Sequence, residues 1–229
     1  MDAWIIGWRA LMSKIRLYVE GGKPLKQPAN KATKDNDREL REGLQVFLSK
    51  ALDGKLLQIV CAGSGSGTCK RFVNDWVKKQ DQEVVKFLLV DSESEVITKD
   101  RRSHLKQGHG QGVAQELSKI EEKYCHLMVQ EMEAWFIADE KALKSVFPND
   151  YQAGKIPQIV DVEIYDKDRV NEMLYAATNR KYVADNEKHP HDKETKLRYS
   201  GRILKQIDPQ VVYEKSKHFR ELIDTLRSL

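Results

Sequence analysis

The sequence has few cysteines, no long apolar run and no strong excess of charge of either sign. Its three cysteines, Cys61, Cys69 and Cys125, contain no Cys-x-x-Cys pair, which argues against a disulfide framework and against a zinc ribbon. No segment approaches the roughly 20 consecutive apolar residues that cross a bilayer. The first eleven residues are also too short for the full anatomy of a signal peptide. We therefore expect a cytoplasmic protein with no membrane partner.

The charge is nearly balanced, because 39 basic and 35 acidic residues give a formal net charge of +4. This balance does not by itself indicate a nucleic-acid partner, so such a partner has to be inferred from where the charges lie. Hydrophobic residues make up 40% of the chain and charged residues 32%, a composition that predicts a folded protein. The length of 229 residues allows one large core, or a smaller core with an additional part.

The hydrophobic pattern alternates between short apolar runs and helical periodicity. Runs rich in branched and aromatic residues predict strands at 15–19, 56–62, 84–90 and 124–129. Helical spacing predicts a helix at 35–52 and another whose apolar face is Phe72, Val73, Trp76 and Val77. A short helix is predicted near 113–122, and a further helix after the fourth strand carries Met132, Trp135, Phe136 and Ala138. The polar segment 94–112 is expected to be a long loop. This order is typical of an α/β fold with a doubly wound, mainly parallel sheet and helices on both faces.

The pattern changes after Phe147-Pro148, where only helical segments follow, at 167–178, 197–207 and 211–226. We therefore predict three parts: an N-terminal extension at 1–13, an α/β metal-binding core at 14–148 and a helical C-terminal extension at 149–229 that packs on the core. The extension at 1–13 is predicted because Met12-Ser13-Lys14 would itself make a sensible start.

Carboxylates follow three of the four predicted strands. The first strand ends in Glu20, the third in Asp91 and Glu93, and the fourth is followed by Glu131 and Glu133. In an open α/β sheet, ligands bind outside the carboxyl ends of the strands. Several carboxylates held together at one edge repel one another, and a divalent cation relieves that repulsion. Such hard oxygen ligands suit Mg²⁺ or Mn²⁺.

Two details of this acidic group are predicted from spacing. Asp91 and Glu93 are two residues apart, so they point the same way and share a site if the strand continues. Glu131 is interpreted differently, as a negative charge that favours the N-terminus of the following helix.

Two segments carry a resemblance to a known group. Tyr18-Val19-Glu20-Gly21-Gly22 and Leu88-Leu89-Val90-Asp91-Ser92-Glu93 resemble the TOPRIM (topoisomerase-primase) signature, a glutamate after the first strand and an Asp-x-Asp-type pair after the third. The residues at 126–130 and 132–139 resemble a TOPRIM-like family of uncharacterised prokaryotic proteins, often encoded beside AAA-type or ABC-type ATPases in genome-defence loci. The elements Lys196, Ile207-Asp208-Pro209 and His218-Phe219 are also similar to it.

The resemblance implies metal-dependent phosphodiester chemistry. It implies Glu20 as general base or metal ligand, Asp91 and Glu93 as metal ligands, and Glu133 as the ligand that completes the site. A basic side chain that neutralises the pentavalent phosphorane would help, and Lys196 is our candidate for this catalytic role.

The sequence departs from the TOPRIM pattern at two positions. Glu93 stands in place of the second aspartate, which lengthens one ligand by a methylene group. Tyr199 stands where a histidine is expected, which puts the catalytic role of the late basic region in doubt.

Basic residues near this edge are candidates for substrate binding. The segment 63–68 lacks the Gly-Lys-Ser/Thr ending of a phosphate-binding P-loop, so ATP binding is not expected. This turn can still present backbone N–H groups to a nucleic-acid phosphate, with Lys70 and Arg71 assisting. Arg101 and His104 lie in the polar segment after the third strand, and Arg202 ends the basic run 188–202. The alternative for each is a plain connection or a solvated face.

Three functions are compatible with these residues. The first is a Mg²⁺-dependent nuclease acting on DNA or RNA, the effector of an anti-phage or genome-defence module with a partner ATPase, a setting implied only by the resemblance. The second is a non-catalytic binding module that docks on an ATPase or a nucleic acid. The third is another phosphotransfer reaction, such as nucleotidyl transfer. The sequence leaves the nucleic acid, the activity of the isolated chain and homo-oligomer formation open.

Overall fold

The computed structural model describes residues 14–22, 31–78, 81, 83–182 and 193–229, so the extension predicted at 1–13 lies outside the described residues. Four parallel strands form one sheet in the order β2-β1-β3-β4. These strands are β1 (Lys14–Val19), β2 (Gln58–Cys61), β3 (Val84–Asp91) and β4 (Cys125–Met128). The predicted α/β class with a parallel sheet is confirmed.

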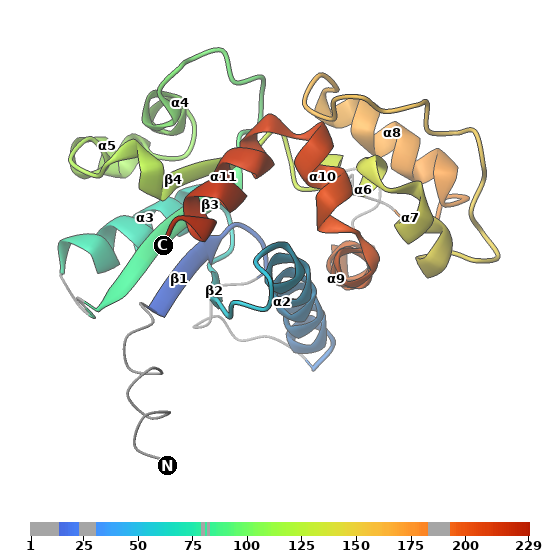
Figure 1. The fold of residues 1–229 in the computed structure, drawn as a ribbon, viewed down its shortest axis with the longest axis horizontal. Coiled ribbons are helices and arrows are strands. Elements are labelled where there is room, and N and C mark those ends of the chain that lie inside the picture. The colour runs from blue at the N-terminus through green and yellow to red at the C-terminus, as the bar shows by residue number, and fades with distance from the viewer. Residues whose placement is uncertain (1–13, 23–30, 79–80, 82, 183–192) are drawn as a thin grey trace.

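Helices cover both faces of the sheet (Figure 1). Successive residues of a strand point to opposite faces. In β1, Leu17 joins the buried cluster that contains α2 (Lys31–Ala51), whereas its neighbour Tyr18 joins the cluster that contains α3 (Gly65–Val77). In β3, Phe87 and Leu88 divide between the two clusters in the same way. The sheet is therefore buried on both faces, and most strand positions carry apolar residues, which is why the strands were visible in the sequence as apolar runs.

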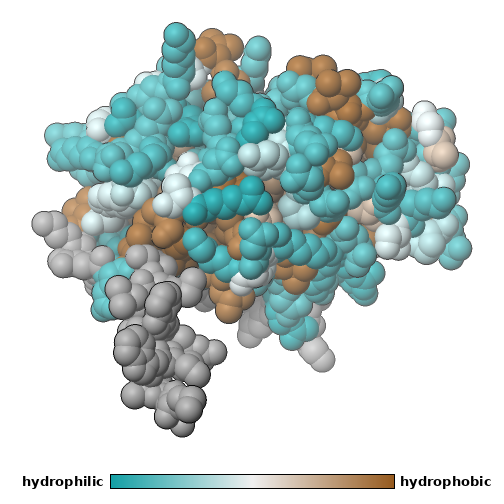
Figure 2. All heavy atoms as spheres, viewed as in Figure 1, coloured by the Kyte–Doolittle hydropathy of each residue, from teal (hydrophilic) through white to brown (hydrophobic). Residues whose placement is uncertain are grey.

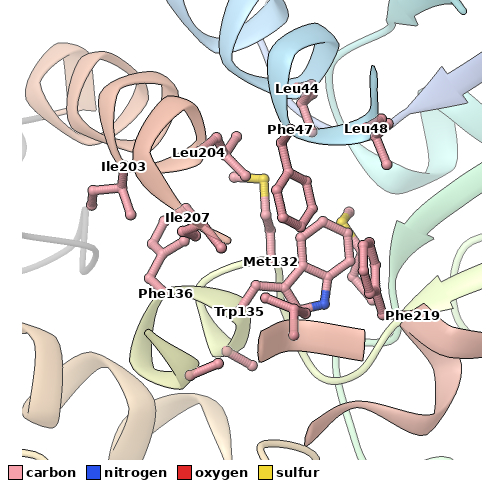
Figure 3. Packing of buried hydrophobic residues seen from close by; sticks show 14 of the residues in the cluster. Leu44, Phe47, Leu48, Met132, Trp135, Phe136, Ile203, Leu204, Ile207 and Phe219 are labelled. Atoms are coloured by element: carbon pink, nitrogen blue, oxygen red, sulfur yellow. The ribbon is translucent and has the colours of Figure 1, made fainter. Parts of the chain in front are cut away.

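The C-terminal helices share the core of the sheet. They are α8 (Lys167–Ala177), α9 (Lys193–Gln206), α10 (Pro209–Lys215) and α11 (Lys217–Arg227). Phe219 of α11 stacks on Phe47 of α2 at a ring-centre distance of 5.1 Å and meets Trp135 edge-on at 5.0 Å (Figure 3). Trp135 and Phe136 are buried, as expected from their helical spacing with Met132. Residues beyond 148 thus pack directly against α2 and the sheet.

Helices α2 and α9 approach each other backbone to backbone. A Cβ atom built on Gly43 would lie 2.4 Å from the carbonyl oxygen of Gly201, and one built on Gly201 would lie 2.3 Å from the carbonyl oxygen of Glu39. Real side chains do not approach this closely, so glycine at both positions allows the two helices to touch. This contact fixes the position of α9, which carries Lys196 toward the carboxyl edge of the sheet.

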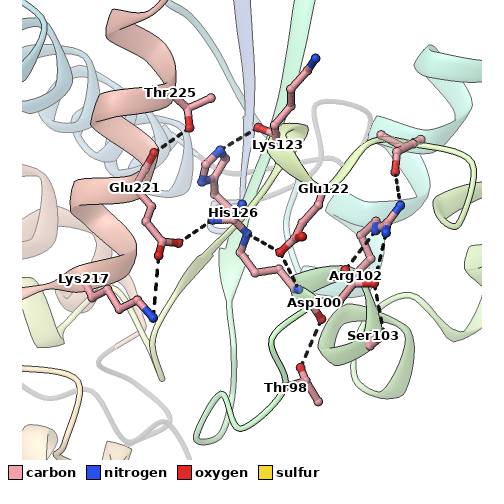
Figure 4. Close-up of polar contacts among 12 residues, drawn as sticks. Thr98, Asp100, Arg102, Ser103, Glu122, Lys123, His126, Lys217, Glu221 and Thr225 are labelled. Atoms are coloured by element: carbon pink, nitrogen blue, oxygen red, sulfur yellow. Dashed lines mark hydrogen bonds and ion pairs between the residues drawn. The ribbon is translucent and has the colours of Figure 1, made fainter.

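Several predicted elements differ from the structure. Segment 94–112 contains a helix, α4 (Arg101–Gln107), whose start is capped by the Asp100 carboxylate, which accepts a hydrogen bond from the Arg102 backbone N–H at 2.9 Å (Figure 4). The predicted turn at 63–68 already contains the first turn of α3, because Ser64 caps that helix. Val77, predicted on the apolar face, is 58% exposed.

Three other helical segments are divided or shorter than predicted. The single helix expected at 211–226 is two helices. The Ser216 backbone is extended and ends α10, and its side chain caps α11 by accepting from the Phe219 backbone N–H at 3.1 Å. The helix expected near 113–122 is reduced to short turns, η1 (Gln111–Val113), α5 (Ala114–Leu117) and η2 (Glu122–Tyr124). After β4 the chain forms α6 (Ala134–Ala138) and α7 (Glu140–Val146), where a single helix was predicted.

The surface in Figure 2 is mainly hydrophilic, with apolar patches at its upper margin over the loops that precede α4 and α8. The loop before α4 contains the exposed Ile97, and the loop before α8 contains Val160 and Ile164. Within the described residues, no helix has both the length and the apolar character needed to cross a membrane.

Candidate metal centre

The carboxyl ends of β1 and β3 bring the predicted acidic residues together. The two strands are direct neighbours, and the Glu20 backbone N–H donates to the Leu89 carbonyl oxygen at 3.1 Å. β4 lies on the other side of β3, so the segment after it reaches the same edge. The topology therefore gathers the side chains that follow three separate strands, as expected for a ligand site in an open parallel sheet.

Glu20 is held by two backbone N–H groups. Its Oε1 accepts from Gly65, the first residue of α3, at 2.8 Å, and its Oε2 accepts from Asp91 at 3.1 Å. Burial raises the pKa of Glu20; the adjacent His109 opposes this shift and the Glu93 carboxylate adds to it. The carboxylate is thus fixed in orientation and sits in an environment that disfavours its negative charge.

Glu20, Glu93 and His109 form a group that can hold a metal ion. Each offers one ligand atom, and these atoms lie within 4.8 Å of one another. The His109 ring passes so close to α3 that a Cβ atom on Gly65 would lie 2.5 Å from its Nδ1 and 2.7 Å from Glu20 Oε2. Gly65 therefore provides the space in which the imidazole and the carboxylate meet.

His109 also contacts the end of β3. Its Nε2 lies 2.9 Å from the Asp91 carbonyl oxygen and 3.9 Å from Glu20 Oε2. Two acceptors would repel at 2.9 Å, so we assign the proton to Nε2, which donates to the carbonyl. From the sequence, His109 was interpreted as part of a solvated or substrate-contacting basic loop, with zinc ligation by His104 and His109 as the weaker alternative. Its placement between Gly108 and Gly110 was a further signal, of a closely packed position.

Asp91 and Glu93 were predicted to point the same way if the strand continues, and this condition is not met. β3 ends at Asp91, and Glu93 takes a left-handed backbone conformation with φ of 62°. Asp91 Oδ1 accepts from the Met132 backbone N–H at 3.0 Å, while the Glu93 carboxylate joins the group with Glu20 and His109. Burial, followed by the charges of Glu20 and Glu133, raises the pKa of Asp91 well above its usual value.

Glu133 is bound within a buried network of polar side chains. Its Oε1 receives Lys196 Nζ at 2.7 Å and the Tyr182 hydroxyl at 2.8 Å. Tyr182 also meets the Ser200 hydroxyl at 3.0 Å. Burial alone would raise the pKa of Glu133, but the Lys196 ammonium outweighs it and the pKa is lowered. Two predicted site residues, Glu133 and Lys196, are therefore brought together as an ion pair that ties α9 to the segment after β4.

Glu131, interpreted from the sequence as a charge at a helix N-terminus, lies just before α6 and is buried. The residue is 3% exposed, and its Oε1 is a buried atom with no hydrogen-bond partner. Burial, followed by the charge of Glu133, raises the pKa of Glu131 to about 8. A buried carboxyl oxygen without a partner is costly, and a bound cation would satisfy it.

The predicted substrate-binding residues fall into two groups. Arg101 Nη1 binds Glu221 Oε2 of α11 at 2.7 Å, and its Nε lies 3.4 Å from Glu122 Oε1, so Arg101 links α4 to the C-terminal helix. His104 Nε2 lies 2.8 Å from the Ser92 carbonyl oxygen and so anchors α4 to the end of β3. Both residues are occupied by contacts within the protein.

The other group lies at the surface. The Lys70 side chain packs against Gly112, so it lies beside the segment that carries His109. Arg71 follows it on α3 and is half-buried. Arg202 is exposed on α9, with its guanidinium 5.9 Å from the centre of the Tyr199 ring. The first five residues of the basic run 188–202 lie outside the described residues.

Lys167 was missed by the sequence interpretation. The first residue of α8, it places its Nζ in an ion pair with the Glu93 carboxylate. The two residues are 74 positions apart, and no local pattern links them.

These features define the class: an α/β protein with a carboxylate-rich site, able to hold a metal ion, at the carboxyl edge of a four-stranded parallel sheet. The chain belongs to the family DUF4276, described as a domain of unknown function, whose model matches residues 32–227. The match covers Asp91, Glu93 and His109 and begins after Glu20. Searches of curated proteins and of solved structures gave no match. Membership of the TOPRIM group remains a prediction.

Proposed function

We propose that the protein is a divalent-metal-dependent nuclease that hydrolyses phosphodiester bonds in DNA or RNA. The observation that carries this proposal is the convergence of Glu20, Glu93 and His109, with their ligand atoms within 4.8 Å, at the edge of a parallel sheet where ligands bind. Asp91 and the unpartnered Glu131 oxygen lie in the same acidic region and add to the demand for a cation.

The donor set fits a divalent metal ion. Carboxylate oxygens suit both Mg²⁺ and Mn²⁺, and the imidazole of His109 favours Mn²⁺ of the two. Glu20, Glu93 and His109 would hold the ion, with the Glu131 carboxyl group nearby as a further oxygen donor. Bound there, the metal would lower the pKa of a coordinated water and stabilise negative charge on a phosphate.

The protein's own residues orient this site. Two backbone N–H groups hold the Glu20 carboxylate, and one holds the Asp91 carboxylate, so neither needs to reorganise when a ligand arrives. Lys196 is bound to Glu133 at 2.7 Å, so we assign it a positioning role in place of the direct contact with phosphate that its charge suggested. Lys70, beside the His109 segment, is placed to bind the backbone of a nucleic acid.

We further propose that a nucleic acid and a partner ATPase are the binding partners, as the TOPRIM resemblance implies. The alternative is a non-catalytic module that binds the same partners. The two functions share their fold and their acidic edge, so activity is the property that separates them.

The test is cleavage of labelled single-stranded DNA, double-stranded DNA and tRNA with Mg²⁺, Mn²⁺ or EDTA. The variants are Glu20→Gln and Asp91→Asn, which remove charge and preserve shape. Glu95→Gln is the matched control, because Glu95 is exposed in the loop that follows Glu93. We expect metal-dependent cleavage by the wild type and by Glu95→Gln, and a loss of at least about 100-fold in the other two variants.

The assay is repeated with an AAA-type or ABC-type ATPase from the same genome, chosen from beside the gene where one is encoded there, because activation by a partner is part of the proposal. Absence of cleavage in every combination, with no change in melting temperature when Mn²⁺ is added, would favour the binding module. Cleavage that survives in Glu20→Gln and Asp91→Asn would locate the reaction elsewhere.

A further inference from the structure

Lys167 is a basic residue that pairs directly with Glu93, one of the three residues that can hold a metal ion. Its ammonium contacts the Glu93 carboxylate, and the charges of Glu131 and Asp91 also act on it. The backbone at this position is fixed, because the Asp166 side chain caps α8 by accepting from the Arg169 N–H at 2.7 Å. The lysine side chain is long and flexible, so the Lys167 ammonium can move while the Lys167 backbone stays beside the site.

The two lysines of the acidic region differ in their freedom. Lys196 faces the buried carboxylate of Glu133, which is 2% exposed, and the Tyr182 hydroxyl holds the same oxygen. The Lys167 side chain is 31% exposed and its partner Glu93 is 44% exposed. An exposed ion pair of this kind is weak, so another cation can replace the ammonium at low cost.

We propose that Lys167 is a displaceable counter-ion of the site, which neutralises Glu93 before a metal ion binds and then binds a phosphate of the nucleic acid. A metal ion and the ammonium compete for the same carboxylate, so binding of one releases the other. An ammonium group has three donors and no acceptor, so once released it can bind only an acceptor or an anion. The phosphate of a nucleic acid is the anion that this edge would receive, and this second step rests on the proposed function.

The first measurement is a titration of the full chain with Mn²⁺. The electron paramagnetic resonance signal of free Mn²⁺ gives the fraction that is bound. The variants are Lys167→Met and, as control, Lys155→Met, which changes an exposed lysine in the loop that precedes α8. Removing a competing ammonium should tighten Mn²⁺ binding about threefold, as expected for the loss of one exposed ion pair. The control should bind as the wild type does.

The second measurement is the salt dependence of binding to a labelled single-stranded oligonucleotide by fluorescence anisotropy, with Ca²⁺ in place of Mn²⁺. Loss of one phosphate contact should reduce the slope of log K against log salt by about 0.7 for a single strand. Lys167→Arg keeps the charge and should keep the slope. A circular dichroism spectrum identical to that of the wild type establishes that each variant is folded.

The outcomes separate this inference from the nuclease proposal. Unchanged Mn²⁺ affinity and unchanged slope in Lys167→Met, relative to Lys155→Met, would overturn the inference. Tighter Mn²⁺ binding with an unchanged slope would overturn the phosphate contact alone. A wild type that cleaves nothing, combined with both expected shifts in Lys167→Met, would support the inference while the nuclease proposal fails.

Discussion

At the scale of single residues, Glu131 is a buried side chain of the acidic edge that lowers the stability of the folded protein. Its Oε1 is buried and has no hydrogen-bond partner, and its pKa is raised to about 8 by burial and then by the charge of Glu133. Ionisation of this carboxyl group is therefore unfavourable in the folded protein. A residue that served stability alone would have its oxygen paired or would be apolar.

The first prediction concerns pH. The carboxyl of Glu131 has its usual pKa of 4.5 in the unfolded chain and about 8 in the folded protein. Between these values the folded state binds more protons, so the free energy of unfolding falls as pH rises. We expect Glu131→Gln to gain stability relative to the wild type between pH 5 and pH 8, measured by urea unfolding in EDTA.

Glu95→Gln is the control for this pH series, since Glu95 is exposed and lies outside the acidic edge. Its difference from the wild type should stay constant across the range. A constant difference for Glu131→Gln as well would contradict the predicted titration. Glu20 and Asp91 also have raised pKa values, so part of the wild-type pH dependence should remain in the variant.

At the scale of elements, the contact between α2 and α9 depends on two glycines. Alanine in place of glycine inside a helix usually stabilises a protein by about 0.5–1 kcal/mol. Here a Cβ on Gly201 would lie 2.3 Å from the Glu39 carbonyl oxygen, so the helices would have to separate. We expect Gly201→Ala to lower the free energy of unfolding by about 1–3 kcal/mol, the usual cost of overpacking.

Urea unfolding of Gly201→Ala and of Arg202→Ala tests this prediction, because Arg202 is exposed at the next position of the same helix. The control should change stability by less than about 0.5 kcal/mol. A Gly201→Ala protein as stable as the wild type would show that the helices adjust without cost.

The elements found from the sequence are those with a continuous apolar signal. The four strands are buried on both faces, so nearly every residue is apolar, and the runs were recognisable. Helix α4 was missed because Leu105 is its only buried residue, which leaves no periodic pattern. Its signal was the capping residue Asp100, which was overlooked.

The candidate site could be predicted only in part. Strand ends located Glu20, Asp91 and Glu93, because the edge of a parallel sheet follows from the strand order. The turn of the chain after Asp91 rests on a single backbone angle at Glu93, which no sequence pattern shows. The pairing of Glu93 with Lys167 joins a loop and a helix that are distant in the sequence, so it required the tertiary structure.

At the scale of the whole molecule, one hydrophobic cluster includes residues from β1, α2, α6 and α11. The predicted parts 14–148 and 149–229 therefore share a core within the described residues. A core built from both parts predicts that the chain unfolds in one transition.

Phe219→Ala tests this cooperativity. Phe219 stacks on Phe47 and meets Trp135, so its truncation should lower the free energy of unfolding by about 3–5 kcal/mol. In each protein, tryptophan fluorescence and far-ultraviolet circular dichroism should report the same urea midpoint as each other. The shared midpoint should be lower in the variant than in the wild type. Leu229→Ala, at an exposed position, is the control. Separate midpoints for the two probes would show that the C-terminal helices unfold independently.

The left-handed backbone of Glu93 has an evolutionary consequence. Glycine and asparagine adopt this conformation readily, whereas a glutamate does so only at a cost. In a lineage where selection maintains only the fold, mutation should therefore replace Glu93 with glycine or asparagine. Among descendants of one ancestral gene, glutamate at this position would mark the lineages in which the acidic edge is still under selection, and glycine would mark those that have kept the scaffold and lost its chemistry.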